Sequence, residues 1–387
     1  MFKKYKSEIN AILFAVISFD FMTSFWFNIL KDNNIKIENI PLYFLISKVL
    51  RMVASIPTGL LADKFGNKVT FYLARFSMLF SFLILLISAN EYTLFLALSF
   101  RALFQASFYG KVESYIYNYT AHKKRKDLFG KLVTAFYGIG DLIASIVGFI
   151  SVIIFKKYGY DGLLICSLFG AILSIFLIKN IDISYFNRNE KIFFKEIVRK
   201  SYQAFRKDNH LLHLTLFFAV MNFFGWNASL IGTMILSDNK SGTVTIANFH
   251  NLTMLTMSFG CLCSWFISNK INLKQSSFLF MTLHLIFFVS VVASYGSNIA
   301  YLLLSFIFIY CTIEIAIERS MESSVDSKTR NTIISFANTV TSLIGIFGNL
   351  LISYFSKKFG IKFGITMWIL IFLCYSLYNF KYFSKKS

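Results

Sequence analysis

Several carboxylates lie inside long apolar stretches of the sequence, and three of them are the first candidates for chemistry. Asp20 is near the middle of the first stretch, and Glu314 and Glu318 are in the tenth. An ionisable side chain at the centre of a bilayer costs at least about 2.5–3.5 kcal/mol, so such residues are rare and usually functional. A carboxylate in a low-dielectric cavity can titrate near neutral pH and carry a proton across. All three are therefore candidates for proton coupling.

Each of these acids also has a structural interpretation. Asp20 could be a permanently paired carboxylate, with Lys48 or Arg101 as its partner, since both cations also lie near the middle of apolar stretches. Glu314 and Glu318 are four residues apart, so they share one helical face and can couple in titration. One of them could bind a proton or a cationic substrate.

The fourth apolar stretch adds Lys111 and Glu113 in its cytoplasmic half. Glu113 is a further candidate for proton coupling. Lys111 could pair with Glu318, because the fourth and tenth stretches are equivalent if the chain has two similar halves. Buried cations such as Lys48 and Arg101 would also favour an anionic substrate.

Polar and aromatic residues come together in the seventh stretch, in the segment MNFFGWNASL. Asn222 and Trp226 share one helical face, and Asn227 follows directly. Such residues suit a cavity for amphipathic molecules. They are equally typical of simple helix packing.

The composition requires a membrane around these residues. Of 387 residues, 56% are hydrophobic and only 15% are charged, whereas soluble domains have about 45–50% apolar and about 25% charged residues. A spanning helix needs about 20 apolar residues. The formal net charge of +20 does not indicate nucleic-acid binding, because the basic residues are not clustered as a binding face.

Twelve apolar stretches are long enough to span a bilayer, and they predict an all-α membrane protein with two six-helix bundles. We expect an N-terminal bundle at 1–180, a cytoplasmic linker at 181–210 and a C-terminal bundle at 211–387. The stretches are 11–30, 39–61, 70–88, 93–119, 131–154, 163–179, 211–236, 244–268, 276–294, 299–321, 333–355 and 363–380.

The basic residues of the connecting segments predict the orientation, because Lys and Arg are retained on the cytoplasmic side. Of the 39 Lys and Arg, 25 lie in the termini and the even-to-odd loops, if Lys131 and Lys179 at the ends of two stretches are counted with the adjoining loops, and 8 lie in the opposite loops. We therefore expect a multi-pass protein of the plasma membrane with both termini in the cytoplasm. Most of the positive charge then reflects topology.

The loop between the second and third stretches reads PTGLLADKFGNKVTF. A glycine in a tight turn allows a positive φ, and a carboxylate can lie against a helix N-terminus. The residues at fixed spacing in this loop are Gly59, Asp63, Lys64, Gly66 and Lys68.

This loop resembles the signature of the major facilitator superfamily, and the resemblance covers essentially the whole chain. It implies the twelve-helix facilitator fold, a monomer, and a gating loop in which Asp63 has a conformational role. Segments around Arg101 with Glu113, and around Arg330 with Ser335, are similar to those of bacterial drug-efflux members. The fifth stretch lacks the Gly-Pro pair of the antiporter motif, which departs from that subfamily.

Cofactor chemistry has no signal in the sequence. There is no phosphate-binding glycine loop, no Ser/His/Asp arrangement in a soluble domain and no Cys/His metal-ligand spacing, and the five cysteines lie in apolar stretches. We therefore expect no metal, no cofactor and no enzyme activity.

Two transport functions are consistent with these patterns. The leading hypothesis is proton-coupled efflux of small amphipathic or antibiotic-like compounds by alternating access. The alternative is a proton-coupled importer of a small nutrient or metabolite, in particular an anionic one. From another class, a non-transporting receptor or an intramembrane scaffold would not need the intact gating motif. The expected partners are the substrate, protons and the lipid bilayer.

Overall fold

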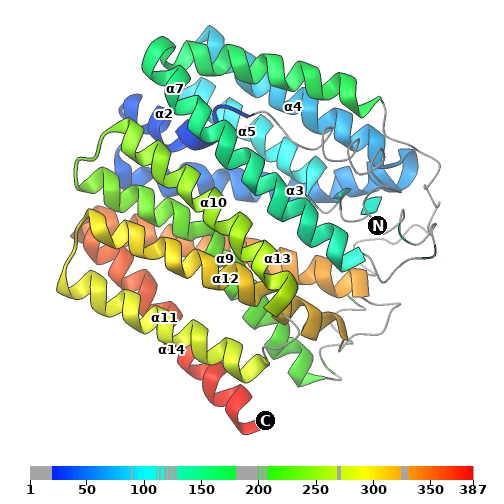
Figure 1. The fold of residues 1–387 in the computed structure, drawn as a ribbon, viewed down its shortest axis with the longest axis vertical. Helices are drawn as coiled ribbons and strands as arrows, with labels where there is room; N and C mark the ends of the chain where they lie inside the picture. Colours follow the sequence, from blue (N-terminus) through cyan, green and yellow to red (C-terminus); the bar gives the residue numbers. More distant parts are fainter. Residues whose placement is uncertain are drawn as a thin grey trace. The chain divides into compact units, whose positions relative to one another are not determined.

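The computed structural model describes most of the chain in helices. The described residues are 20–88, 90–109, 111–112, 115–116, 120, 124, 129–179, 199, 203, 206, 208–267, 272–323 and 330–386, without the side chains of some helical residues in these ranges. All regular elements in these ranges are α- or 3-10 helices (Figure 1). The chain divides into two compact units: unit 1 is Met1–Ile35 with Ile46–Lys191, and unit 2 is Lys36–Leu45 with Ile192–Ser387.

Unit 1 contains a short entry helix and long apolar helices. Its elements are η2 (Thr23–Phe25), α2 (Trp26–Asp32), most of α3 (Ile40–Phe65), α4 (Asn67–Ile87), α5 (Glu91–Phe108) and α7 (Phe129–Ile178). Helix α4 packs against α5 and α7. Asn90 starts α5 with a capping box, in which its side chain accepts from the backbone N–H of Thr93, so the helix start is satisfied locally.

Helix α7 is long enough for two membrane crossings. Its 50 residues would extend about 75 Å if straight, against a hydrocarbon core of about 30 Å. Gly159 breaks it with φ 64° and ψ −155°, a conformation that residues with a Cβ avoid. The break falls between the fifth and sixth expected spans.

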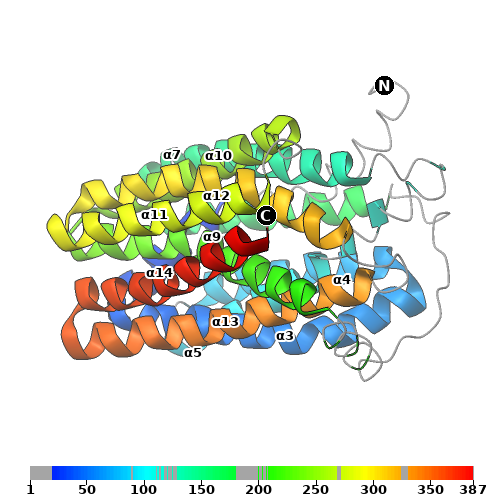
Figure 2. The ribbon, with the colours of Figure 1, turned by 90° about the horizontal axis from the view of Figure 1, so that it is seen from below.

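Unit 2 is built from six long helices after the short η3 (Ile37–Asn39). They are α9 (Asn209–Asp238), α10 (Thr243–Ile267), α11 (Leu273–Ala293), α12 (Ser297–Ser323), α13 (Arg330–Phe359) and α14 (Ile361–Lys386). Helix α12 packs against α9, α10 and α11. Figure 2 shows α14 beside α11 and α13, in agreement with their contacts.

Aromatic side chains fill the interior of unit 2 between α9, α11 and α14. Phe224 stacks on Trp368 at 4.9 Å, and Phe372 lies 4.9 Å from the same indole. His284 is wholly buried 4.3 Å from Phe224, and its Nδ1 is 2.8 Å from the Phe280 carbonyl. This is a hydrogen-bonded core histidine inside an aromatic cluster.

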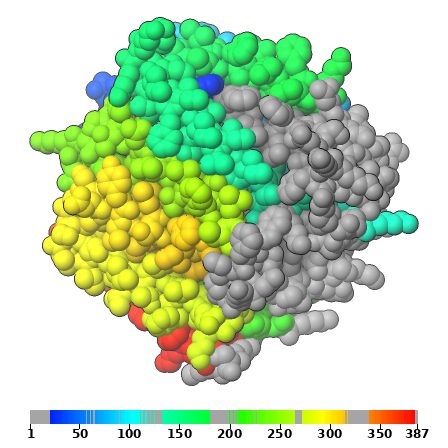
Figure 3. Space-filling view, in the orientation of Figure 1, coloured from blue at the N-terminus to red at the C-terminus, as the bar shows by residue number. Residues whose placement is uncertain are grey.

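The outer faces of these helices are apolar, as a lipid environment requires. In the described residues, seven helices are long and apolar enough to cross a membrane. The yellow atoms of α11 lie on the surface in Figure 3. The exposed large side chains of that helix include Phe278, Leu285, Ile286, Val289 and Val292.

From the second span onward, the described helices overlap the expected spans, whereas residues 11–19 of the first expected span lie outside the described residues. The fourth span differs in where its helix ends. The sequence predicts an apolar span over 93–119, but α5 ends at Phe108 and Tyr109 is extended, with φ −66° and ψ 138°. The next residue is Gly110, and glycine is about 1 kcal/mol less favourable than alanine in a helix. Lys111 and Val112 are again helical.

Candidate functional site

The gating motif lies at the junction of α3 and α4. Gly59, Asp63 and Lys64 belong to the last two turns of α3, and the side chains of Asp63 and Lys64 are outside the described residues. Gly66 separates the helices with φ 88° and ψ 159°. The Lys68 ammonium donates to the carbonyl of Lys179 at 2.9 Å, so a cation lies at the C-terminal end of α7, where the helix dipole favours it.

Replacing Gly66 by Ala should destabilise the protein by about 1–3 kcal/mol, because only glycine adopts this backbone conformation without strain. Thermal unfolding of the purified protein in detergent measures the loss. Gly59→Ala is the matched control, since Gly59 belongs to the same motif and an added Cβ would meet nothing within 4 Å. Equal melting temperatures for the two variants would contradict a strained turn.

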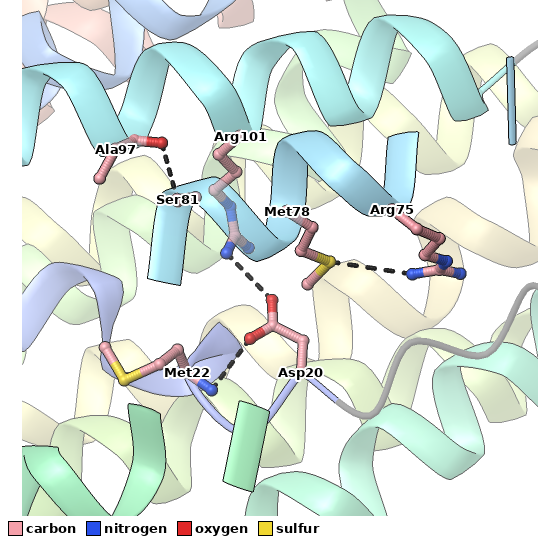
Figure 4. Close-up of polar contacts among 7 residues, drawn as sticks. All are labelled: Asp20, Met22, Arg75, Met78, Ser81, Ala97 and Arg101. Carbon is pink, nitrogen blue, oxygen red and sulfur yellow. Dashed lines mark hydrogen bonds and ion pairs between the residues drawn. The ribbon is translucent and has the colours of Figure 1, made fainter. Parts of the chain in front are cut away.

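Asp20 forms a buried ion pair in unit 1. One carboxylate oxygen accepts from the Arg101 guanidinium at 3.1 Å, and the other accepts from the Met22 backbone N–H at 2.9 Å (Figure 4). The exposed fraction is 5% for the Asp20 side chain and 18% for that of Arg101. Arg101 also lies 4.7 Å above the Trp26 ring. Of the two partners considered for Asp20, the structure therefore pairs it with Arg101.

A second arginine, Arg75 of α4, lies in the same unit and is 1% exposed. Its guanidinium is 5.4 Å from the Phe104 ring and 5.3 Å from the Phe108 ring, and one nitrogen is 3.8 Å from the Met78 sulfur. Asp20 attracts it electrostatically. Aromatic faces stabilise a cation through the ring quadrupole, so α5 provides a surface on which this charge is held.

Helix α3 contributes two more cations to the interior of unit 1. Lys48 and Arg51 are three residues apart and so lie on one helical face. Both are partly exposed, and their positive charges repel each other. Arg51 lies 5.0 Å from the Tyr109 ring. An anion placed against this face would be attracted by both charges.

Glu314 is an acid of unit 2 that lies in a membrane-spanning helix, α12. It is partly exposed, and it interacts with the phenol of Tyr310 one turn before it. The thiols of Cys261 and Cys311 also lie close enough to interact with Tyr310. Among the described side chains, the site thus combines a carboxylate, a phenol and weakly polar thiols. This set can hold or release a proton.

The structure describes only some of the remaining predicted site residues. Glu113 is outside the described residues, and so are the side chains of Glu318, Asn222 and Trp226. Lys111 is described and partly exposed. Asn227 is 1% exposed, and its amide donates to the Phe223 carbonyl of the same helix at 2.7 Å.

Tyr310 and Gly225 are functional candidates that the sequence did not single out. Tyr310 is one of 20 tyrosines, so residue type alone does not distinguish it. Its spacing of four residues from Glu314 was a usable signal, because residues four apart are neighbours on a helix. Gly225 had no such signal, since its importance depends on the helix packed against it.

Comparisons with known proteins agree with this architecture. The family model described as Major Facilitator Superfamily matches residues 10–349. No curated protein matches the chain at the level of sequence. A crystal structure of a mutant form of the nucleoside transporter NupG has a similar fold, with 14% identity and a TM-score of 0.68 over 98% of this chain and 99% of that chain. With twelve expected spans, the described helices and a family match over most of its length, this chain belongs to the major facilitator superfamily of membrane transporters.

Proposed function

We propose that the protein is a proton-coupled transporter of a small organic anion. The observation that carries the proposal is the pairing of Asp20 with Arg101. It neutralises the acid at the centre of the first span. Asp20 is therefore engaged by Arg101, and the remaining charges inside the first-half spans still have a positive sum.

The charges inside the expected spans support an anionic substrate. Away from the ends of the spans, the first half has five cations against three acids, namely Lys48, Arg51, Arg75, Arg101 and Lys111 against Asp20, Glu113 and Asp141. A surplus of positive charge in a low-dielectric environment is unfavourable. A bound anion would offset it, whereas a cationic substrate would add to it.

Glu314 is the acid that we assign to proton coupling. The Asp20 carboxylate accepts from a guanidinium and a backbone N–H, so it is already part of an ion pair. The structure places the Glu314 carboxylate against the phenol of Tyr310, which is a neutral group. Protonation of Glu314 therefore breaks no ion pair with Tyr310, whereas protonation of Asp20 would break its pair with Arg101.

The second candidate function is proton-coupled efflux of amphipathic compounds. The acids Glu314 and Glu318 favour it, because they could receive a cationic substrate. The similarity to a nucleoside transporter, at 14% identity, supports the fold and does not select a substrate. The cytoplasmic location of both termini also stays a prediction from the loop charges.

Reconstitution in proteoliposomes with an imposed pH gradient tests the proposal. The panel contains the anions succinate, citrate and gluconate, the lipophilic cations tetraphenylphosphonium and ethidium, and uncharged uridine. We expect saturable movement of an anion that accelerates with the proton gradient and stops when the gradient is collapsed. Gradient-driven movement of the cations, with the anions inactive, would replace this proposal by the efflux function.

Lys48→Met should weaken binding of the transported anion about tenfold, equivalent to about 1.4 kcal/mol. The expected signature is a higher KM with little change in the maximal rate, since Lys48 would attract the substrate in all states of the cycle. Lys274→Met is the control, because Lys274 is an exposed lysine at the start of α11. An unchanged KM for Lys48→Met would exclude its role in binding the anion.

A further inference from the structure

Tyr310 lies in direct contact with the backbone of α9 at Gly225. A Cβ added at Gly225 would overlap three atoms of the Tyr310 ring. Gly225 is therefore required for the close approach of the ring to this helix, since any side chain here would displace the ring. The approach joins a buried phenol of α12 to the backbone of α9.

Helix α10 also packs closely against the turn of α12 that contains Tyr310. A Cβ at Gly260 would lie 2.8 Å from the Cys311 Cβ and 2.8 Å from the Phe308 carbonyl oxygen. The Thr312 hydroxyl donates to the Phe308 carbonyl at 2.8 Å and is 3.5 Å from the Gly260 carbonyl. The turn of α12 that contains Tyr310 is thus packed closely against both α9 and α10, which lie beside it (Figure 1).

The hydroxyl of Tyr310 is buried against the Glu314 carboxylate, but among the described residues it has no hydrogen bond of good geometry. The residue is 2% exposed. Leaving a buried hydroxyl unsatisfied costs about 1–3 kcal/mol. The titratable groups that the structure places against it are Glu314 and Cys311 of α12 and Cys261 of α10. Of these, the Glu314 carboxylate is the strongest acceptor, because hydrogen bonds to an ionised group are about twice as strong as neutral ones.

We propose that Tyr310 is a positioning residue that transmits the protonation state of Glu314 to α9 through its contact with Gly225. When Glu314 is ionised, the phenol, which lies against the carboxylate, moves closer and donates to it. When Glu314 is protonated, that attraction weakens and the ring returns to its position against Gly225. The inference rests on the proposed role of Glu314 in proton coupling.

The contact between Tyr310 and Gly225 lies next to the predicted substrate-cavity residues of α9. Asn222 precedes it by three residues, and Trp226 and Asn227 follow it directly on α9. These three residues are the predicted substrate-cavity positions. A displacement of the α9 backbone at Gly225 therefore moves the segment of helix that contains them.

Two variants test this transmission from Glu314 through Tyr310 to Gly225, which we call the relay. The probe is the anion of the transport panel that the wild-type protein accumulates most. Tyr310→Phe keeps the ring and removes the hydroxyl, so we expect it to fold normally. Proton-driven accumulation should fall about tenfold, whereas counterflow exchange at equal pH should stay within about twofold of the wild type. A merely structural role would lower both activities together.

Gly225→Ala should give the same uncoupling, because the methyl group displaces the Tyr310 ring. Gly232→Ala is its matched control: Gly232 also lies on α9, and an added Cβ would overlap the ring of Phe249 of α10. Gly232→Ala therefore introduces a comparable steric overlap at a position that is not in contact with Tyr310. We expect it to reduce the amount of folded protein while the ratio of proton-driven to exchange transport is preserved.

The outcomes separate this inference from the proposed function. If Glu314→Gln retains proton-driven accumulation, the assignment of the proton site fails, and the relay fails with it. If Glu314→Gln is uncoupled but Tyr310→Phe and Gly225→Ala keep the wild-type ratio, only the relay is overturned. Equal uncoupling by Gly225→Ala and Gly232→Ala would also overturn it, because the effect would then be general to α9.

Discussion

Replacing Glu314 by Gln is expected to abolish accumulation of the substrate against its gradient. Gln has nearly the same shape but cannot release a proton. Each pH unit corresponds to about 1.4 kcal/mol per proton, or a tenfold concentration ratio. At a gradient of two pH units, a carrier that couples one proton per substrate accumulates about 100-fold, and the variant should reach a ratio of about 1.

Counterflow exchange should survive in this variant, because exchange at equal pH does not require Glu314 to change its protonation state. The measurement is uptake into proteoliposomes, with a trapped pH dye reporting proton entry. Glu91→Gln is the control, since Glu91 is an exposed acid in the first turn of α5. Full accumulation by Glu314→Gln would move the assignment to Glu318, Glu113 or Asp20.

Replacing Asp20 by Asn is expected to destabilise the protein by about 3 kcal/mol while leaving proton coupling in place. Removing one partner of a buried ion pair costs about 3–5 kcal/mol because the other charge is left without compensation. The lower end applies here, since 18% of the Arg101 side chain is exposed. Thermal unfolding in detergent and proton-driven uptake of the folded fraction measure the two effects separately.

A double-mutant cycle shows whether the loss belongs to the ion pair. Arg101→Met alone should also destabilise, because it leaves the carboxylate of Asp20 without its guanidinium. The combined variant Asp20→Asn with Arg101→Met should be clearly more stable than the sum of the single losses predicts, with a coupling free energy of at least about 1 kcal/mol. Normal stability of Asp20→Asn combined with lost coupling would identify Asp20 as the proton site instead.

The local architecture of the protein could be predicted from the sequence because it depends on local patterns. Long apolar stretches require helices in a membrane, since the backbone must satisfy its own hydrogen bonds there. The turn at Gly66 could likewise be predicted, because a glycine in a tight loop between two spans indicates a positive φ. The structure has a φ of 88° at this residue. The end of α5 at Phe108 was missed, because an apolar stretch does not mark where a helix is interrupted.

The candidate sites depend on contacts between residues far apart in the chain. Asp20 had two candidate partners of the same charge at similar depth, and only the packing of α5 selects Arg101 over Lys48. The contact of Tyr310 with Gly225 joins residues 85 positions apart. The sequence by itself determined the membrane environment, the helices and the set of charges inside them. The tertiary structure decided which of these side chains meet, because the rotation and depth of each helix follow from packing summed over all its neighbours.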